Sequence, residues 1–191
     1  MDYEFTQNWF EYGERLWPLI IPHLPKVNSK NFLEIGSYEG KSTTWIMENM
    51  MSKDDFIYCI DTWQGGEEHA SIEMSAVESR FRNNIAIASS KTGIKPIIKK
   101  GKSFDQMCRI NDTFDFIYVD GSHQTPDVLT DAVMAFNMLN QHGVIVFDDY
   151  LWGNPAMPLH RPKAAIDDFM NIHAEKIAIL HIGYQVVIKK L

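Results

Sequence analysis

The sequence predicts an α/β protein with a doubly wound, mostly parallel sheet and an antiparallel hairpin at its C-terminal end. Short apolar runs that stop at Gly or Asp alternate with segments whose apolar residues recur every three or four positions, as in strands connected by helices. Near the end of the chain, two apolar runs flank a tight connection at Gly183, which indicates a hairpin. The hairpin breaks the parallel pattern.

Five runs are expected to form the parallel strands, and all but the third are rich in β-branched and aromatic residues. Two of the helices between them carry start signals. Ser103 with Gln106 forms a capping box, and Thr125 precedes a proline at the first helical position. The predicted parallel strands are 31–35, 56–60, 95–99, 114–119 and 144–147, and the predicted hairpin strands are 177–180 and 185–188.

A chain of 191 residues is about the size of one domain, so we expect residues 1–191 to form a single domain. Residues 1–28 are expected to form an N-terminal helical cap. Within it, the spacing of Phe10, Leu16 and Trp17 predicts an amphipathic helix over residues 6–20. We expect this helix to cover one end of the domain.

The composition excludes several classes of partner. The formal net charge of -7 argues against binding to nucleic acid, which usually requires a basic face. The N-terminus lacks the basic and apolar regions of a signal peptide, and no apolar run is long enough to span a bilayer. Cys59 and Cys108 show neither disulfide nor metal-site spacing. We therefore expect a cytoplasmic protein that binds neither nucleic acid nor membrane; its oligomeric state has no signature in the sequence.

A loop with two glycines follows the first predicted strand. Its spacing is E-x-G-x-x-x-G, from Glu34 through Gly36 to Gly40, and it lies where open α/β sheets bind ligands. Asp61 ends the next strand, at about the separation expected for an acid that accepts hydrogen bonds from ribose hydroxyls. Each feature alone is typical of a turn or a helix cap. Together they predict a nucleotide-type ligand.

Residues 32–150 resemble the catechol and caffeoyl-CoA O-methyltransferase group, first in LEIGSYEGKS at 33–42. IDTWQGG at 60–66 and VDGSH at 119–123 also resemble small bacterial enzymes related to macrocin-type sugar O-methyltransferases. The resemblance implies a Rossmann-like class I methyltransferase fold and the cofactor S-adenosylmethionine (SAM). By position, the resemblance implies that Gly36, Tyr38 and Ser42 line the methionine end of SAM, that Asp61 binds the ribose and that Ser103 lies near the adenine. The full set expected to bind the cofactor is Glu34, Gly36, Ser37, Tyr38, Gly40, Ser42, Asp61, Thr62, Trp63, Ser103 and Asp120.

Three aspartates follow two further predicted strands: Asp120 after 114–119, and Asp148 and Asp149 after 144–147. In neighbouring strands their carboxylates would converge and repel one another unless a cation lay between them. Metal-dependent members of the resembling group carry Asp, then Asp followed by Asp or Asn, at these positions. We therefore expect all three to bind Mg²⁺ or another divalent cation. In the alternative, the aspartates cap loops, and Asp120 serves SAM or the substrate without a metal.

His123 lies three residues after Asp120, where catechol O-methyltransferase carries its catalytic lysine, and its pKa suits a general base. The prediction is divalent-metal-assisted O-methylation of a small hydroxylated acceptor from SAM, with Asp120 and His123 as catalytic residues. The loops around Trp63 and Trp152 are expected to close over this acceptor.

Three other functions stay open at this stage. The first is a metal-independent O- or N-methyltransferase that uses His123 as its base. The second is an NAD-type oxidoreductase, against which the missing G-x-G-x-x-G and the terminal hairpin argue. The third is a SAM-binding module without activity.

Overall fold

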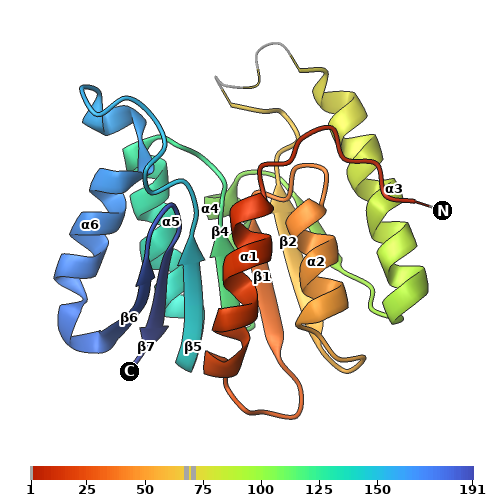
Figure 1. The fold of residues 1–191 in the computed structure, drawn as a ribbon, viewed down its shortest axis with the longest axis horizontal. Coiled ribbons are helices and arrows are strands. Elements are labelled where there is room, and N and C mark those ends of the chain that lie inside the picture. Colours follow the sequence, from red (N-terminus) through yellow and green to blue (C-terminus); the bar gives the residue numbers. More distant parts are fainter. Residues whose placement is uncertain (1, 67–68, 70–71) are drawn as a thin grey trace.

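The computed structural model describes residues 2–66, 69 and 72–191, and it contains a seven-stranded sheet with helices on both faces (Figure 1). The strand order is β3-β2-β1-β4-β5-β7-β6. The first five strands are parallel, and β7 is antiparallel to both β5 and β6. This arrangement confirms the predicted doubly wound sheet and its C-terminal hairpin.

The element bounds agree with most of the predicted segments. The strands are β1 (Asn31–Ile35), β2 (Phe56–Asp61), β3 (Ile97–Lys100), β4 (Phe114–Val119), β5 (Leu139–Phe147), β6 (Ile177–Ile182) and β7 (Val186–Lys190). The α-helices are α1 (Glu11–Ile20), α2 (Lys41–Asn49), α3 (Met74–Thr92), α4 (Ser103–Met107), α5 (Thr125–Met138) and α6 (Pro162–Ile172), and short 3₁₀ turns lie at Ile21–His23, Pro158–His160 and Ala174–Lys176. Within the described part of the chain, no helix has the length and apolarity that crossing a membrane requires.

Two apolar layers cover the sheet. Every residue of β4 is buried, which explains why its sequence is a nearly continuous apolar run rather than an alternating one. Apolar side chains of α4, α5 and α6 pack on one face, and those of α1, α2 and α3 pack on the other. The central strands are thereby fixed from both sides.

Helix α1 differs from its prediction in both extent and place. It begins at Glu11, five positions after the predicted start at residue 6, and it packs on a sheet face rather than over an end of the domain. Figure 1 shows it in front of the central strands. Trp17 is fully buried, and its ring meets the rings of Phe116 and Tyr118 on β4 edge-on.

Both predicted helix-start signals are wrong in detail, because the hydroxyls make tertiary contacts instead. Ser103 is the first residue of α4, after the N-cap position, and its hydroxyl interacts with Asp131 of α5. The Thr125 hydroxyl donates toward the carbonyl oxygens of Pro158 and Arg161, both at 2.8 Å. These two side chains connect separate segments rather than capping their own helices.

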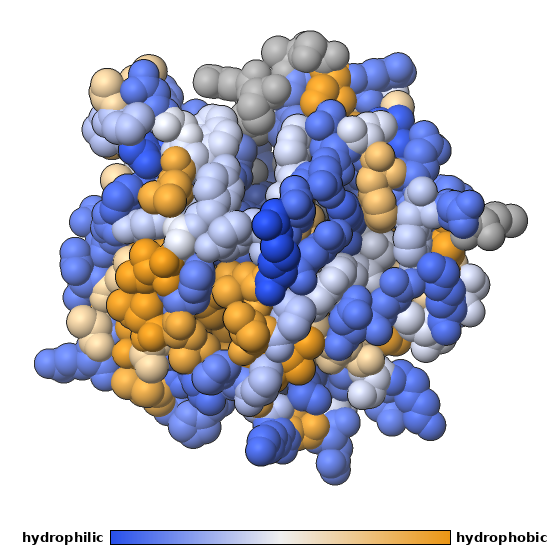
Figure 2. Space-filling view, viewed as in Figure 1, coloured by the Kyte–Doolittle hydropathy of each residue, from blue (hydrophilic) through white to orange (hydrophobic). Residues whose placement is uncertain are grey.

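The outer edge at β6 carries an apolar surface. Figure 2 shows an apolar patch over the region of β6 and the adjoining part of α1, whereas much of the remaining surface in this view is hydrophilic. Leu19 on α1 and Ile179 and Ile182 on β6 are among the exposed apolar side chains. The patch does not contribute to the large cavity described below.

The carboxyl ends of β1, β4 and β5 lie in register, which places the following residues side by side. Ile35 pairs with Val119, and Val119 pairs with Phe147. The next residue after β1 is Gly36, whose φ is +87° and where an added Cβ would lie 1.9 Å from the Asp120 carbonyl oxygen. Gly36 therefore allows close contact between two backbone segments.

Replacement of Gly36 by Ala is expected to lower the free energy of unfolding by at least about 3 kcal/mol, because the methyl group would overlap the Asp120 backbone. Gly93→Ala is the matched control: Gly93 also has a positive φ, +77°, but nothing lies within 4 Å of an added Cβ. The Gly93→Ala substitution should lower the free energy of unfolding by about 1 kcal/mol. Urea denaturation measures both, and equal losses would contradict the close-contact argument.

Candidate active site

The loop after β1 is built around the carboxylate of Glu34, which is fully buried. It accepts hydrogen bonds from the hydroxyls of Ser37 and Ser42, both at 2.6 Å, and from that of Thr43. Burial raises the pKa of Glu34, and these three donors oppose the rise. Glu34 therefore orders the loop through these hydrogen bonds. It does not line the cavity, so it is not placed for direct contact with SAM.

Asp61, at the end of β2, holds the same loop from the side. One carboxylate oxygen accepts the backbone N–H groups of Ser37 and Tyr38 at 2.9 and 2.8 Å, and the other accepts that of Trp63 at 2.7 Å. Burial raises the pKa of Asp61, while these backbone hydrogen bonds lower it. Asp61 also faces the cavity, so it both orders the loop and remains accessible to a ligand.

A cavity of about 1040 Å³ lies over the carboxyl edge of the sheet. It is at the upper end of the roughly 300–1,000 Å³ that is usual for small-molecule sites, so it can hold a nucleotide-sized ligand and a second small molecule. Gly36, Ser37, Tyr38 and Ser42 line it on the β1 side. Asp61, Thr62, Ser103 and Asp120 line it at the ends of the other strands.

The remaining residues of the predicted SAM set lie behind the wall of this cavity. Gly40 has a φ of +80°, and an added Cβ there would meet the Phe81 ring at 2.9 Å. Trp63 packs against Phe81 and donates its indole N–H to the Tyr38 carbonyl oxygen at 2.9 Å. Together with Glu34, these residues support the loop and do not line the cavity.

The segment before α1 forms part of the cavity wall, which was not predicted from the sequence. Gln7, Trp9 and Phe10 line it, and the Trp9 ring lies 5.0 Å from that of Tyr38. Thr6 donates its backbone N–H and its hydroxyl to Glu39, at 2.6 and 2.8 Å. These contacts are between distant segments, so no local motif marks them.

Both loops that were expected near the acceptor contribute to the wall. Gly65, Gly66 and His69 lie on one side of the cavity, and Trp152 lies on the other. The Trp152 ring packs against that of His123, with 4.2 Å between centroids. Whether either loop closes over a ligand remains a prediction.

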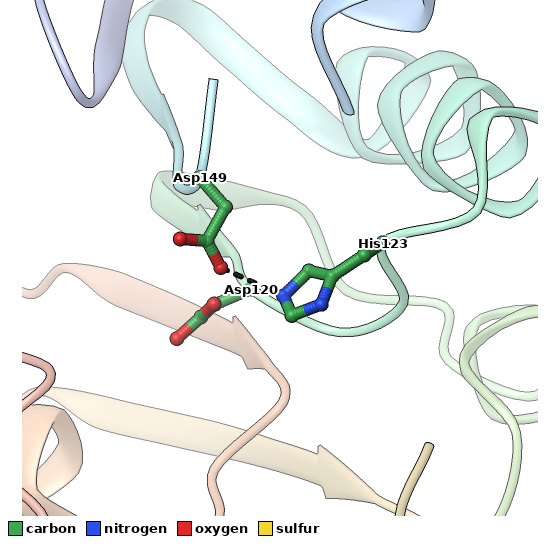
Figure 3. Close-up of side chains that lie close together, drawn as sticks. All are labelled: Asp120, His123 and Asp149. Atoms are coloured by element: carbon green, nitrogen blue, oxygen red, sulfur yellow. Dashed lines mark ion pairs between the residues drawn. The ribbon is translucent and has the colours of Figure 1, made fainter. Parts of the chain in front are cut away.

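Asp120, His123 and Asp149 converge at one point of the cavity (Figure 3). One potential ligand atom from each lies within 4.8 Å of the others. His123 Nε2 and Asp149 Oδ2 are 2.7 Å apart. All three side chains are half-buried, so the group is shielded from bulk solvent but open to the cavity.

Asp148, the third residue of the predicted metal set, lines the cavity but is not one of the three residues that converge, and its carboxylate already has donors. One carboxylate oxygen accepts the hydroxyl of Tyr118 and the amide of Gln185, the latter at 2.8 Å, and the other accepts the Asp149 backbone N–H at 2.7 Å. His123 takes its place beside Asp120 and Asp149. The difference arises because buried donors already surround Asp148.

Gln185 is itself fixed from the far side. Its side-chain oxygen accepts the indole N–H of Trp17 at 2.8 Å, and both residues are buried. A single glutamine carries no local signal of a buried partner, so this role of Gln185 could not be predicted from the sequence. Hydrogen bonds from Trp17 through Gln185 to Asp148 thus connect α1 to the neighbourhood of Asp120, His123 and Asp149. We call these last three residues the acidic group.

The carboxylates of Asp120 and Asp148 lie in an unfavourable electrostatic environment. Burial and the neighbouring carboxylates raise the pKa of Asp120 well above its usual value and that of Asp148 to about 6. The Tyr118 hydroxyl lies beside both carboxylates, 3.0 Å from Asp120, yet a phenol has only one proton to donate. A further proton or a cation is therefore favoured at this point.

A methyltransferase domain family matches residues 33–150. A protein of Acanthamoeba polyphaga mimivirus is 26% identical over 130 residues, which are 66% of this chain and 56% of that protein. The match thus spans little more than half the length of this relative.

Two solved structures show the same fold. An O-methyltransferase of tomaymycin synthesis from Streptomyces achromogenes, in complex with SAM, has a TM-score of 0.68 at 17% identity, over 94% of this chain and 79% of that one. An O-methyltransferase from Bacillus cereus, in complex with S-adenosylhomocysteine (SAH), has a TM-score of 0.64 at 17% identity, over 100% and 84% of the two chains. Because the family match covers more than half of the sequence, the chain belongs to this methyltransferase domain family.

Proposed function

We propose that the protein transfers a methyl group from SAM to a hydroxyl of a small acceptor, with a divalent cation at the acidic group. The observation that carries this proposal is that one continuous cavity joins the glycine loop and Asp61 to the group of Asp120, His123 and Asp149. A nucleotide-type cofactor and an acceptor hydroxyl can thus lie in the same cavity. Membership of the methyltransferase domain family supports the assignment.

The residues present fit SAM. Asp61 uses three backbone donors, and a carboxylate offers about four lone-pair positions, so acceptor capacity is left for a ribose hydroxyl. The N–H groups of Ser37 and Tyr38 are already bonded to Asp61. The methionine end of SAM would therefore contact the cavity wall near Tyr38 and Ser42, and it would bind groups other than these two backbone amides.

The residues present also fit a divalent cation. Two carboxylates and an imidazole nitrogen are a usual donor set, and their close approach leaves negative charge to be neutralised. Because the set includes imidazole, it favours Mn²⁺ or a similar transition metal over Mg²⁺, which prefers oxygen ligands. A cation bound here would lower the pKa of an acceptor hydroxyl. The Tyr118 hydroxyl, which lies beside both Asp120 and Asp148, would help to hold the Asp120 carboxylate in place.

The contact between His123 and Asp149 favours a second candidate, metal-independent transfer with His123 as the base. In this arrangement Nε2 faces Asp149, and Nδ1 is buried away from solvent. His123 would have to turn before either nitrogen could take a proton from an acceptor. The metal-assisted function requires no such turn, since Nε2 and the carboxylates already point to one place.

Asp61→Ala should weaken the binding of SAM and SAH by about 10- to 100-fold, because it removes a ribose acceptor and also releases two loop amides. Isothermal titration calorimetry measures the affinity. Asp54→Ala is a suitable control, since Asp54 is exposed and lies outside the cavity. Wild-type protein that binds neither compound at millimolar concentration would refute the proposed cofactor.

Asp149→Asn should weaken Mn²⁺ binding at least about 10-fold, because it replaces a charged ligand by a neutral one. Titration followed by electron paramagnetic resonance gives the Mn²⁺ affinity, and calorimetry should show SAH affinity within about 3-fold of wild type. Asp127→Asn, on the same cavity wall but outside the acidic group, is the control. If wild type binds no Mn²⁺ at millimolar concentration, the metal-independent function is favoured instead.

Asp148 should make the stability of the protein depend on pH. Its pKa is raised from 3.8 to about 6 on folding, so the folded state holds a proton that the unfolded state has lost. The associated stabilisation is complete below about pH 4 and is lost as the pH rises through 6. Asp148→Asn should therefore gain stability relative to wild type between pH 4 and pH 7.5, by on the order of 2 kcal/mol. Urea denaturation without divalent cations tests this; a pH-independent difference would contradict it.

A further inference from the structure

Asp131, on α5, is a buried acid in the cavity wall to which neither the sequence nor the proposed chemistry assigned a role. It is 3% exposed and lines the cavity. Its carboxylate lies between Ser103, which interacts with it, and Gly121, where an added Cβ would be 3.5 Å from Oδ2. It therefore stands where the segment after β3 meets the segment after β4.

The protein satisfies this carboxylate only in part. Burial raises the pKa of Asp131 to about 6, and the Ser103 hydroxyl lowers it, whereas the nearby Asp127 raises it further. Among the described residues, no lysine, arginine or histidine forms an ion pair with Asp131. A buried carboxylate with one hydroxyl group beside it has acceptor positions to spare, and a ligand N–H group in the cavity can use them.

An aromatic ring lies at the same end of the cavity. Phe104 follows Ser103 in the first turn of α4, lines the cavity and is 53% exposed. An exposed phenyl ring is a surface on which a planar heterocycle can stack. A stacking surface beside a buried hydrogen-bond acceptor matches an amino-substituted aromatic base.

The segment after β3 lies beside Asp61, because the Gly101 backbone N–H donates to the Asp61 carbonyl oxygen at 2.9 Å. If Asp61 binds the ribose, the methionine chain extends toward the Tyr38 and Ser42 side. The base, which leaves the ribose in another direction, then meets the segments that follow β3 and β4, which carry Ser103 and Asp131.

We propose that Asp131 accepts a hydrogen bond from the 6-amino group of adenine, and that it selects SAM and SAH over analogues with a 6-oxo base. The inference rests on the proposed SAM binding, and it makes Asp131 a specificity-determining residue of the cofactor site. In such an analogue a carbonyl oxygen would face the carboxylate, so an attraction would become a repulsion. Ser103 would orient Asp131 for this contact.

The test compares SAH with S-inosylhomocysteine, its 6-oxo analogue, by calorimetry on the full chain. Wild type should bind SAH at least about 10-fold more tightly, since a buried acceptor would be left opposite another acceptor in the analogue. Equal binding of the two compounds would overturn the inference while leaving SAM binding intact. Binding of neither compound would instead refute the proposed function itself.

Asp131→Asn provides the sharper comparison. An amide can present either its oxygen to a 6-amino group or its nitrogen to a 6-oxo group, so the preference for SAH should fall to within about 3-fold. Asp127→Asn is the matched control, because Asp127 lies one turn earlier on the same helix, lines the cavity and bonds Ser122 instead. The control should keep the wild-type preference.

A structural role limited to joining α4 and α5 would give a different result. Asp131→Asn would then bind SAH and S-inosylhomocysteine in the wild-type ratio, even if both affinities or the melting temperature fell. That outcome would also overturn the inference. Should the variant fail to fold, equal binding of the two compounds by wild type would still overturn the inference.

Discussion

The requirement that buried carboxylates find donors determines much of this structure. Glu34, Asp61, Asp120 and Asp148 lie at or next to the ends of the four central strands, where burial raises the pKa of each. Three hydroxyls satisfy Glu34, and three backbone amides satisfy Asp61. The shape of the glycine loop follows from these two sets of hydrogen bonds, because the loop and the first turn of α2 supply five of the six donors.

The same requirement connects the N-terminal helix to the acidic group. Asp148 takes its donors from Tyr118 and Gln185, and Gln185 in turn depends on the indole of Trp17. Helix α1 is therefore more than an apolar cover for the sheet. A shift of α1 would remove the partner of Gln185 and leave a buried amide beside a buried carboxylate, an arrangement that costs about 1–3 kcal/mol per unsatisfied group.

The sequence predicted the sheet well, because apolar runs and strand-ending acids are local signals. Strands β1 and β4 have the predicted bounds, and the hairpin lies where Gly183 indicated. The hydrogen bonds of Glu34 and Asp148 to buried donors could not be predicted from position alone, and the ligand contacts expected of these two residues stay predictions. The cavity residues before α1 and the buried Asp131 lacked any local signature, since their contacts join segments far apart in the chain.

Asp120 differs from the other strand-end acids because its set of hydrogen-bond donors is incomplete. Among the described residues its hydrogen-bond partner is the Tyr118 hydroxyl at 3.0 Å, and that group has a single proton and also bonds Asp148. Glu34 and Asp61 thus have three donors each, whereas Asp120, which also lines the cavity, shares a single hydroxyl with Asp148 among the described residues. A carboxylate in that state gains most from a cation or from an acceptor hydroxyl that enters the cavity, so the incomplete donor set of Asp120 is the physical basis for assigning the reaction to this point.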